Sequence, residues 1–560
     1  MTMPTSLPDN TTVTLQQLIN LSADRHSRLV QQLTAMMAEM VQADPNQITA
    51  IADIPFQQFR LDSRQLSPND VFVLLKSQTS DDQKSRDYLL QAAKNAAFIL
   101  SEVDPTSLFN TVNETSPTQA TDNKSVDLPC PIMYVPNVRD FLGSLIQARL
   151  QYQQPVTLPA VIAVTGTNGK TTISQLVAQL TQLTGKSSAV MGTAGNGRLG
   201  ALVQASHTTG DALAVQQFLY QMGTEKAEVL ALEASSHGLD QQRLQGMPVT
   251  VAVYTNLSRD HLDYHADMAE YAAAKAKLFD KAHFPDLTHA VINIDDEHAQ
   301  VMLDTANASG LTVWTYTLDP AKLATFGAVS VMPSLQGVKI TLRTDFGDGQ
   351  TDTVDLVSPL LGRFNVANLL AAIAAAIALD ANTNDIDMAQ IMCAVPQLQG
   401  AVGRMQRVPS NDGCFIVDYA HTPDALSQVL ASLKTHCDGQ LWAVFGCGGD
   451  RDAGKRPLMA QAGLAGADQV ILTADNPRTE DPNVILQDMQ TGMSTEQYQR
   501  THIEPARQKA IEYAVAHASP NDIVVIAGKG HETYQEINHV RYDFDDSVIL
   551  EQALAQVGRI

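Results

Sequence analysis

The chain has 560 residues, a length that favours three domains at roughly 100–200 residues per domain. Its net charge of −23 argues against nucleic acid or an anionic membrane as the main partner, because both require a basic surface. The 5 cysteines form no C-x-x-C pair, which indicates reduced thiols in a cytoplasmic protein rather than disulfides or a structural zinc site.

The first 155 residues carry no catalytic signature of their own. No Lys or Arg precedes Arg25 and no apolar segment follows the start, so we expect no signal peptide. The segment 59–64 predicts a loop that leads into a buried strand at 71–75, and the polar segment 105–128 predicts a long surface loop. We expect residues 1–155 to form a smaller α/β domain.

The second predicted domain, 156–395, opens with an apolar run of strand length at 160–166. Apolar residues then recur at helical spacing from Ile173 to Leu183, and Gly185 suits the end of that helix. Strands predicted at 229–232, 249–253 and 290–294 alternate with helical patterns, which favours a mostly parallel sheet covered by helices on both faces. An Ala-rich helix is expected at 368–380. Its apolar run, 369–379, is well short of the ~20 residues that a membrane span needs, so we expect a soluble protein.

The third predicted domain, 396–560, alternates in the same way. Strands are expected at 415–418, 441–445, 469–473 and 523–527, and each ends in a loop rich in Gly, Asp, His or Arg. Ligands of open α/β sheets bind at the carboxyl ends of the strands. We therefore expect a Rossmann-like α/β domain whose chemistry lies in these loops.

The segment 164–172, V-T-G-T-N-G-K-T-T, joins a predicted strand to a predicted helix. Glycines let backbone N–H groups and the helix N-terminus face phosphate oxygens, while Lys170 reaches the β/γ-phosphates and Thr171 binds Mg²⁺. Val164 stands where the usual pattern has its first glycine, and a simple Gly-rich turn is the alternative. The expected ATP-binding residues of this loop are Gly166, Thr167, Asn168, Gly169, Lys170, Thr171 and Thr172.

The shortened loop T-G-T-N-G-K-T-T resembles that of the Mur ligase and folylpolyglutamate synthetase superfamily. Longer motifs at 233–239, 255–265, 417–426, 445–452 and 528–532 resemble the diamino-acid-adding Mur ligases. The resemblance runs from about residue 160 to the C-terminus. In the first 155 residues it is limited to 61–64 and the strand at Phe72, with Asn69 in place of a usual glycine.

This resemblance implies an ATP-dependent amide ligase of peptidoglycan precursor synthesis. Such an enzyme adds meso-2,6-diaminopimelate to UDP-N-acetylmuramoyl-L-Ala-D-Glu through an acyl phosphate, with Mg²⁺ and ATP, and acts in the cytoplasm as a monomer. Joining a carboxylate to an amine is uphill in water, and phosphoryl transfer to a carboxylate brings anions together, so cations are required.

The same resemblance assigns the metal to Thr171, Glu233, His261 and a carbamylated Lys275. Glu233 follows a buried strand, where a hard oxygen ligand is plausible for Mg²⁺. Carbamylation requires a neutral amine, which desolvation beside cations favours. From the residues alone, the alternative for His261 is a structural hydrogen-bonding role, which the nearby Asp260, Asp263 and His265 make less favoured. The ordinary alternative for Lys275 is a solvated lysine.

The remaining site residues are also carried over by resemblance. Asn368 would contact adenine, Arg404 phosphate and Asp418 ribose, with helix capping as the alternative for the asparagine. The UDP-substrate residues would be Ser63, Thr208, Thr209, Ser235, Gln241 and Arg243. Threonine and serine near glycine are equally ordinary turn residues, whereas Arg243 by itself suggests an anionic partner.

The segment Asp475-Asn-Pro-Arg478 resembles that of ligases selecting meso-2,6-diaminopimelate over L-lysine. Proline fixes the turn, and arginine suits two-point recognition of the one carboxylate by which the two amino acids differ. The expected amino-acid-binding residues are Arg451, Asp475, Asn476, Arg478, Gly528 and Glu532, the last for the distal ammonium.

Other functions remain open at this stage. A lysine-adding ligase is the closest alternative, and Arg478 counts against it. A folylpolyglutamate synthetase shares the phosphate loop but leaves D-N-P-R and D-Y-A-H-T-P unexplained. A P-loop ATPase that regulates a partner, or a catalytically inactive scaffold, comes from a different class; the joint presence of Lys170, Glu233, His261 and Lys275 argues against the scaffold.

Overall fold

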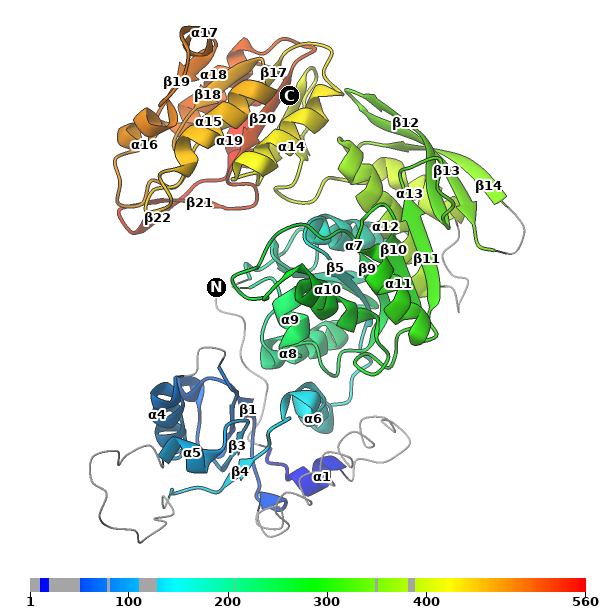
Figure 1. Ribbon diagram of the computed structural model, residues 1–560, viewed down its shortest axis with the longest axis vertical. Coiled ribbons are helices and arrows are strands. Elements are labelled where there is room, and N and C mark those ends of the chain that lie inside the picture. Colours follow the sequence, from blue (N-terminus) through cyan, green and yellow to red (C-terminus); the bar gives the residue numbers. More distant parts are fainter. Residues whose placement is uncertain are drawn as a thin grey trace.

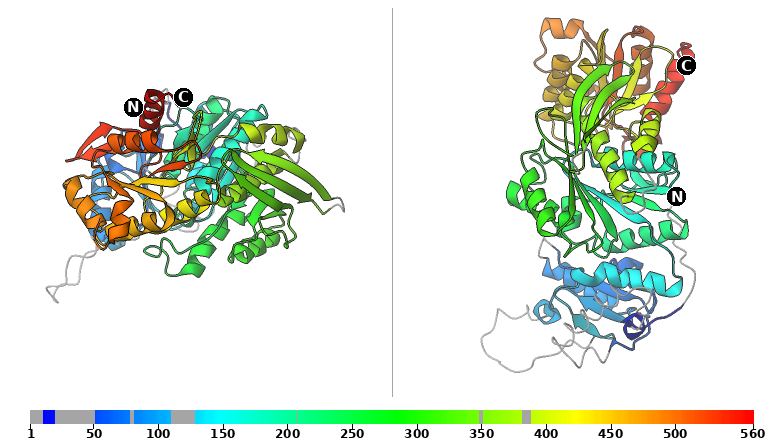
Figure 2. Two further views of the ribbon diagram at one scale, coloured as in Figure 1. Left: turned by 90° about the horizontal axis from the view of Figure 1, so that it is seen from above. Right: turned by 90° about the vertical axis from the view of Figure 1, so that its right-hand side faces the viewer.

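The computed structural model describes residues 11–19, 51–77, 81–109, 128–205, 207–347, 351–380 and 388–560. Three α/β units follow one another along the long axis, the N-terminal unit at the bottom of Figure 1 and the C-terminal unit at the top; the right-hand view of Figure 2 shows the same stacking. Their sheets have 4, 10 and 6 strands, and most neighbouring strands run parallel, which confirms the predicted fold class.

The N-terminal sheet is parallel, in the order β1-β2-β3-β4. Its strands are β1 (Phe59–Arg60), β2 (Val71–Leu74), β3 (Phe98–Ser101) and β4 (Ile132–Tyr134). Its helices are α1 (Leu15–Ile19), η1 (Ser63–Gln65), α4 (Asp82–Ala92), α5 (Pro105–Phe109) and α6 (Arg139–Gln153). Strand β2 is wholly buried, as the sequence predicted. The prediction of a loop from residue 105 was wrong for α5, while 110–127 lies outside the described residues.

The central sheet has the order β14-β13-β12-β11-β10-β9-β5-β8-β6-β7, with β5 between β8 and β9. Strand β5 is buried from its second residue onward, because helices cover both faces of the parallel region. The strands are β5 (Ala160–Thr165), β6 (Ser188–Gly192), β7 (Gly195–Gly197), β8 (Val229–Glu233), β9 (Val249–Tyr254), β10 (His289–Asn293), β11 (Thr312–Thr317), β12 (Phe326–Ser334), β13 (Gly337–Asp345) and β14 (Thr351–Ser358). The helices are α7 (Lys170–Leu183), α8 (Ala212–Thr224), α9 (Ser236–Asp240), α10 (Met268–Ala276), η2 (Lys277–Phe279), α11 (Ala299–Ala308), α12 (Arg363–Asp380), α13 (Met388–Ala394) and η3 (Val395–Gln397).

Strands β12 to β14 form an antiparallel extension of this sheet that the sequence analysis did not anticipate. They project at the right of Figure 1 toward the C-terminal unit. At the β12–β13 turn, the carbonyl oxygen of Ser334 lies 2.8 Å from Nδ1 of His436, and that of Leu335 accepts a hydrogen bond from Arg407 at 3.2 Å. The extension therefore links the central and C-terminal units.

Helix α12 begins at Arg363, five residues before the predicted start. By length and composition alone it is the one described helix apolar enough to cross a membrane, but 72% of it is buried inside the protein. Its alanines let it pack closely against α7 and the strands β9 and β10. It is therefore a core helix of the central unit.

The C-terminal sheet has the order β15-β16-β20-β17-β18-β19 and is parallel except for β15. Its strands are β15 (Gln406–Val408), β16 (Cys414–Asp418), β17 (Leu441–Phe445), β18 (Gln469–Leu472), β19 (Thr501–Ile503) and β20 (Ile523–Ala527), followed by a hairpin of β21 (Tyr534–Ile537) and β22 (Val540–Asp543). Its helices are α14 (Pro423–Lys434), α15 (Lys455–Gly466), α16 (Pro482–Met489), α17 (Thr495–Gln499), α18 (Arg507–His517) and α19 (Asp546–Gln556).

A fully buried ion pair holds the strand ends of this unit. Arg507 Nη2 lies 2.7 Å from Asp546 Oδ2, and both side chains are 0% exposed. The same Nη2 donates to the carbonyl oxygen of Ala527 at the end of β20, 2.9 Å away, and Nη1 donates to that of Ala474 just after β18. Arg507 thus fixes the two loops that begin at these strand ends.

We expect Arg507→Met to lower the free energy of unfolding by about 3–5 kcal/mol, because Asp546 is left charged and unpaired in the core. Urea unfolding followed by circular dichroism measures this loss. The double variant Arg507→Met, Asp546→Leu is the control and should lose less, since no buried charge remains. An equal or larger loss in the double variant would contradict this account.

Candidate active site

The predicted phosphate loop connects β5 to α7, as the sequence indicated. Gly166 and Gly169 have φ angles of +144° and +88°, which a side chain rarely tolerates. A Cβ at Gly166 would lie 1.9 Å from Thr255 Oγ1, so glycine is also required for space. Gly169 precedes α7, whose first N–H groups have no partner within the helix and form a site for an anion.

Lys170 is the first residue of α7, and its ammonium folds back over the loop. Nζ donates to the carbonyl oxygens of Gly166 at 2.9 Å and Thr167 at 2.8 Å. Burial lowers the pKa of Lys170, the carboxylate of Glu233 opposes this shift, and the charge of Arg404 adds to it. A cation therefore lies where the loop would receive phosphate oxygens.

Lys275, on α10, brings a second lysine amine to the same oxygen. Its Nζ donates to the carbonyl oxygen of Gly166 at 2.9 Å and lies 4.5 Å from the ring centroid of Tyr271. The residue is 1% exposed, so the interpretation as a solvated lysine was wrong. Burial, followed by the charge of Lys170, lowers the pKa of Lys275 far below its usual value. Within the described ranges it forms no salt bridge, which is rare for a buried lysine.

Glu233 is a buried carboxylate at the end of β8, 2% exposed. Oε1 accepts hydrogen bonds from Thr171 Oγ1 at 2.9 Å and Thr193 N at 2.8 Å, and Oε2 accepts one from Thr193 Oγ1 at 3.1 Å. A carboxylate beside the hydroxyl that follows the phosphate-loop lysine is a donor set that fits Mg²⁺. Thr193 was not foreseen, because a lone threonine after a strand carries no sequence signal.

His261 lies on the loop after β9 with a φ of +53°. Its Nε2 is 3.5 Å from Asp260 Oδ2, and its ring stands edge-on to His237 at 5.0 Å. No hydrogen bond or salt bridge joins His261 or Lys275 to Thr171 and Glu233, and the described part of the chain contains no group of three His, Cys, Asp or Glu placed to hold a metal. Of the four expected metal ligands, the structure therefore brings only Thr171 and Glu233 into contact.

Asn368 approaches the phosphate loop from α12. A Cβ at Gly169 would lie 2.6 Å from Asn368 Oδ1, so that glycine admits the amide. Asn368 Nδ2 donates to Asn365 Oδ1 at 3.1 Å. Asn368 is buried in the interior of the helix, so the helix-capping alternative was wrong for it. Asn365 lies in the first turn, where its Nδ2 donates to the carbonyl oxygen of Leu361 at 2.8 Å.

Arg404 and Asp418 come from the C-terminal unit. The two oxygens of Asp418 accept from the backbone N–H groups of Met405 and Ala420, each at 2.7 Å, and burial raises the pKa of this carboxyl. The Arg404 guanidinium lies 4.6 Å from the ring centroid of Tyr419. The buried Asp418 thus fixes the backbone next to Arg404.

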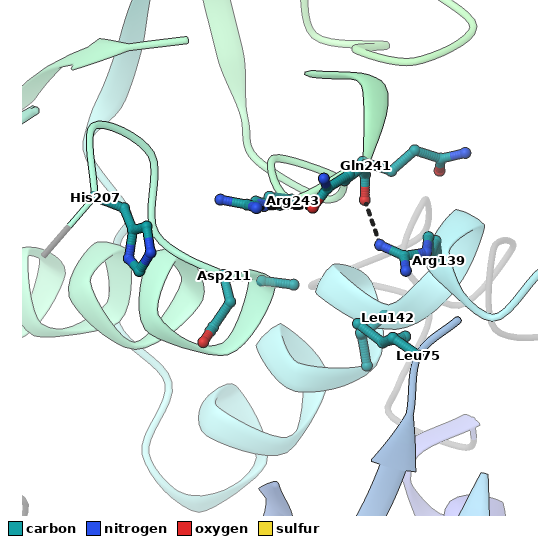
Figure 3. Close-up of a pocket in the computed structure, with 9 residues that line it drawn as sticks. Leu75, Arg139, Leu142, His207, Asp211, Gln241 and Arg243 are labelled. Atoms are coloured by element: carbon teal, nitrogen blue, oxygen red, sulfur yellow. Dashed lines mark hydrogen bonds between the residues drawn. The ribbon is translucent and has the colours of Figure 1, made fainter. Parts of the chain in front are cut away.

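A cavity of about 250 Å³ lies between the N-terminal and central units (Figure 3). Arg139 on α6 reaches across it and donates to the carbonyl oxygen of Gln241 at 3.2 Å, while its Nε lies 2.8 Å from Glu102 Oε1. Arg139 could not be predicted from the sequence, because its domain carries few recognisable motifs. The cavity is lined by Leu75, Arg139, Leu142, His207, Asp211, Ala212, Gln241, Gln242 and Arg243.

Two of the residues expected to hold the UDP-substrate, Gln241 and Arg243, line this cavity. Arg243 donates to Gln241 Oε1 at 2.7 Å and to the carbonyl oxygen of Thr209 at 3.0 Å. Thr209 and Ser235 do not line the cavity but stabilise the backbone next to Arg243. Ser235 caps α9, and its N–H donates to Thr209 Oγ1 at 3.0 Å.

The other two expected residues of this set lie apart from the cavity lining. Thr208 Oγ1 is 3.0 Å from Thr193 Oγ1, next to Glu233. Ser63 belongs to the N-terminal unit, where its hydroxyl donates to Gln91 Oε1 at 3.0 Å. The structure therefore divides this set between the two units that border the cavity.

The loop after β18 is held by the β21–β22 hairpin as well as by Pro477. Arg478 has a φ of +51°; its N–H donates to the carbonyl oxygen of Glu536 at 3.0 Å, and its own carbonyl accepts from Asn538 N at 2.6 Å. Its Nη1 donates to the carbonyl oxygen of Gly449 at 2.7 Å. The guanidinium is thus fixed beside the loop after β17, which carries the exposed Arg451.

Lys529, which the sequence analysis missed, lies at the centre of this loop cluster. It is 0% exposed; Nζ donates to Asn476 Oδ1 at 3.1 Å and lies 3.3 Å from Glu532 Oε2 and 3.8 Å from Asp475 Oδ1. A Cβ at the preceding Gly528, whose φ is +120°, would lie 3.1 Å from Asp475 Oδ2. Glu532 therefore already has a cationic partner before any substrate ammonium approaches.

Two family models match most of the central and C-terminal units. One is described as the Mur ligase middle domain and matches residues 164–376. The other is described as the Mur ligase glutamate ligase domain and matches residues 403–530. Together they cover the phosphate loop, Glu233, Lys275 and the loops of the C-terminal sheet.

Curated relatives match over nearly the whole chain. The UDP-N-acetylmuramoyl-L-alanyl-D-glutamate–2,6-diaminopimelate ligase of Pseudomonas aeruginosa is 42% identical over 90% of this chain and 96% of its own length. The enzyme of the same name from Vibrio vulnificus is 39% identical over 90% and 95%. A solved structure of a ligase of this name has 41% identity and a TM-score of 0.69, covering 98% of this chain and 100% of its own. MurF from Acinetobacter baumannii, at 15% identity, a TM-score of 0.55 and 93% and 98% coverage, shares the fold.

Proposed function

The chain belongs to the Mur ligase family, and we propose that it joins meso-2,6-diaminopimelate to UDP-N-acetylmuramoyl-L-Ala-D-Glu at the expense of ATP. The observation that carries this proposal is the convergence of Lys170 and Lys275 on the Gly166 carbonyl of the phosphate loop. The Lys170 ammonium supplies a cation at this loop, and the buried Lys275 is the amine proposed to carry the carbamate. A cation there suits a reaction in which a phosphoryl group passes to a carboxylate, because both reactants are anions.

In the proposed reaction, a carboxylate oxygen of the D-glutamyl residue attacks the γ-phosphorus of ATP and ADP leaves, giving an acyl phosphate. The amine of diaminopimelate then attacks the acyl carbon, the amide forms, and phosphate leaves. Lys170 neutralises the β/γ-phosphate charge, and Arg404 adds a cation from the C-terminal unit. Bound Mg²⁺ would supply further charge screening, and Thr171 and Glu233 fit it, with His261 and a carbamylated Lys275 proposed for a further ligand set.

In this proposal, each of the three units contributes mainly to the binding of one substrate. We assign the UDP-substrate to 1–155 together with Thr208, Thr209, Ser235, Gln241 and Arg243 of the central unit. We assign ATP to 156–395 and the amino acid to 396–560. ATP and the UDP-substrate are anionic, and diaminopimelate presents two carboxylates. Their binding is compatible with a chain of net charge −23 because Lys170, Arg243, Arg404 and Arg478 supply local cations. All five cysteines are free thiols, which is compatible with the expected cytoplasmic location.

The proposal is tested by mass spectrometry of the product formed from the UDP-dipeptide, ATP, Mg²⁺ and equimolar diaminopimelate and L-lysine. We expect the mass of the diaminopimelate adduct and release of phosphate that depends on diaminopimelate. A lysine adduct would favour the lysine-adding alternative. Phosphate release that ignores both amino acids would instead favour an ATPase that acts on a partner.

Arg478→Ala should lower kcat/KM for diaminopimelate, because the guanidinium is the fixed group suited to its distal carboxylate. The residue is half-buried and keeps Gly449 as a neutral partner, so we place the loss at the low end of the range for a charge pair, about 2 kcal/mol or roughly 30-fold. Competing-substrate kinetics measure this, with the KM for ATP as an internal control. A variant that kept its full preference for diaminopimelate over lysine would refute this role.

A further inference from the structure

The segment 399–405 connects η3 to β15 and carries Arg404. Its backbone is fastened to two different units. At the C-terminal end, Met405 N donates to Asp418 Oδ2 at 2.7 Å and Gly403 N donates to Gln406 Oε1 at 2.8 Å. A Cβ at Gly403, whose φ is +67°, would lie 2.1 Å from the N atom of His531, so this end packs directly on the loop after β20.

The other end is fastened to the phosphate-loop helix by two glutamine side chains. Gln179 Nε2 donates to the carbonyl oxygen of Gln399 at 3.1 Å, and its Oε1 accepts from Gln399 N at 2.7 Å. Gln175 Oε1 accepts from Val402 N at 3.1 Å. The primary amide of Gln179 thus pairs with both backbone groups of one residue, as a neighbouring strand would.

These contacts connect Lys170 to Arg404 through a short path. Gln175 and Gln179 are one turn apart on one face of α7, and Lys170 is the first residue of that helix. Val402 lies two residues before Arg404. The phosphate loop and Arg404 belong to different units, so their relative position depends on what joins α7 to this segment.

We propose that Gln175 and Gln179 are positioning residues for the nucleotide: they fasten the segment 399–402 to α7 and thereby hold Arg404 over the phosphate loop. The inference rests on the proposed function in that Arg404 is taken to contact ATP phosphate. The two glutamine side chains then set the distance between the cationic groups of Lys170 and Arg404.

Three hydrogen bonds of ordinary net strength predict that the double variant Gln175→Leu, Gln179→Leu raises the Kd for ADP about tenfold or more. Isothermal titration calorimetry of ADP with Mg²⁺ measures this. Gln182→Leu is the matched control: Gln182 lies on the same helix, and no hydrogen bond joins it to 399–405 in the described part of the chain. We expect its Kd to stay within about twofold of wild type.

A double-mutant cycle separates positioning from general loosening of the protein. If the glutamines act through Arg404, their replacement in an Arg404→Ala background should change the Kd less than twofold, because the group they position is gone. The KM values for the UDP-dipeptide and diaminopimelate should also remain within about twofold. Additive effects in the cycle, an unchanged Kd, or an equal rise of the KM values for ATP, the UDP-dipeptide and diaminopimelate would overturn the proposal.

Two further outcomes can also be interpreted. If the double variant fails to fold, as judged by circular dichroism, the single Gln179→Leu variant carries it, because Gln179 is only half-buried and water can solvate Gln399 there. If wild-type protein bound ADP but formed no diaminopimelate product, the proposed function would fail. The titration of ADP would still decide whether the glutamines position Arg404.

Discussion

Replacing Lys170 by alanine should lower the rate of ligation by about 10²–10³, the usual loss when a preorganised cation or donor is removed from a transition state. Its ammonium already lies on the phosphate loop, in contact with the carbonyl oxygens of Gly166 and Thr167. Little reorganisation is needed to turn it to phosphate oxygens. Arginine should not restore activity, since a planar guanidinium does not reproduce a compact ammonium that donates to the carbonyl oxygens of Gly166 and Thr167.

Product formation and phosphate release under saturating substrates measure this effect. Circular dichroism should be unchanged, because the backbone of the loop is fixed by Gly166, Gly169 and the N-terminus of α7. Lys509→Ala is the matched control, an exposed lysine on α18 far along the sequence from the loop, and should retain wild-type activity. A folded Lys170→Ala enzyme with near-normal turnover would refute the assignment of the phosphate loop.

Lys275→Ala should be nearly inactive, with a loss of at least about 10²–10³, and short carboxylic acids should restore part of the activity. The structure gives the physical reason: Lys275 is buried, has no salt bridge among the described residues and shares an acceptor with Lys170. A positive charge is unfavourable there, so the neutral amine that CO₂ attacks is accessible. The resulting carbamate is an anion, and the positive charge of the neighbouring Lys170 would stabilise it.

The direction of the pH dependence follows from the lowered pKa of Lys275. The neutral amine dominates above that lowered pKa, so the carbamate should form at neutral pH and be lost as the solution is acidified. Intact-mass measurement after CO₂ depletion and after added bicarbonate tests this directly. Lys277→Ala is the control: this half-exposed lysine pairs with Asp240 at 2.7 Å and should not respond to carboxylic acids. An unmodified Lys275 in active enzyme would contradict the proposal.

Local patterns were sufficient for most of the parallel framework. The strand at 160–165 and the helix after it were predicted because apolar spacing and the glycines act within a few residues. The β12–β14 extension was missed because its alternation of buried and exposed residues depends on which face the rest of the protein covers. The short helix α5 was missed because its polar composition resembles that of the loop that follows.

The site residues also divide into those that local motifs predict and those that depend on distant partners. The phosphate-loop lysine and the D-N-P-R arginine stand in motifs whose meaning is local, so the sequence could name them. Lys529 and Arg139 could not be named, since each gains its importance from partners more than 50 residues away, such as Asn476 and Gln241. The direction of the Arg478 side chain likewise depends on a hairpin some 60 residues further along the chain, in addition to the proline before it.

The sequence by itself determined the fold class, the family and the residue types that carry the chemistry, because motifs and hydrophobic period are written in consecutive residues. Only the tertiary structure decided the electrostatics: it buried Lys275 beside Lys170 and brought Glu233 into hydrogen-bond contact with Thr171. Among the described residues, no hydrogen bond joins His261 to that pair. Burial and through-space charge arise only when distant segments meet, and they are what turn an ordinary lysine into one with a strongly lowered pKa.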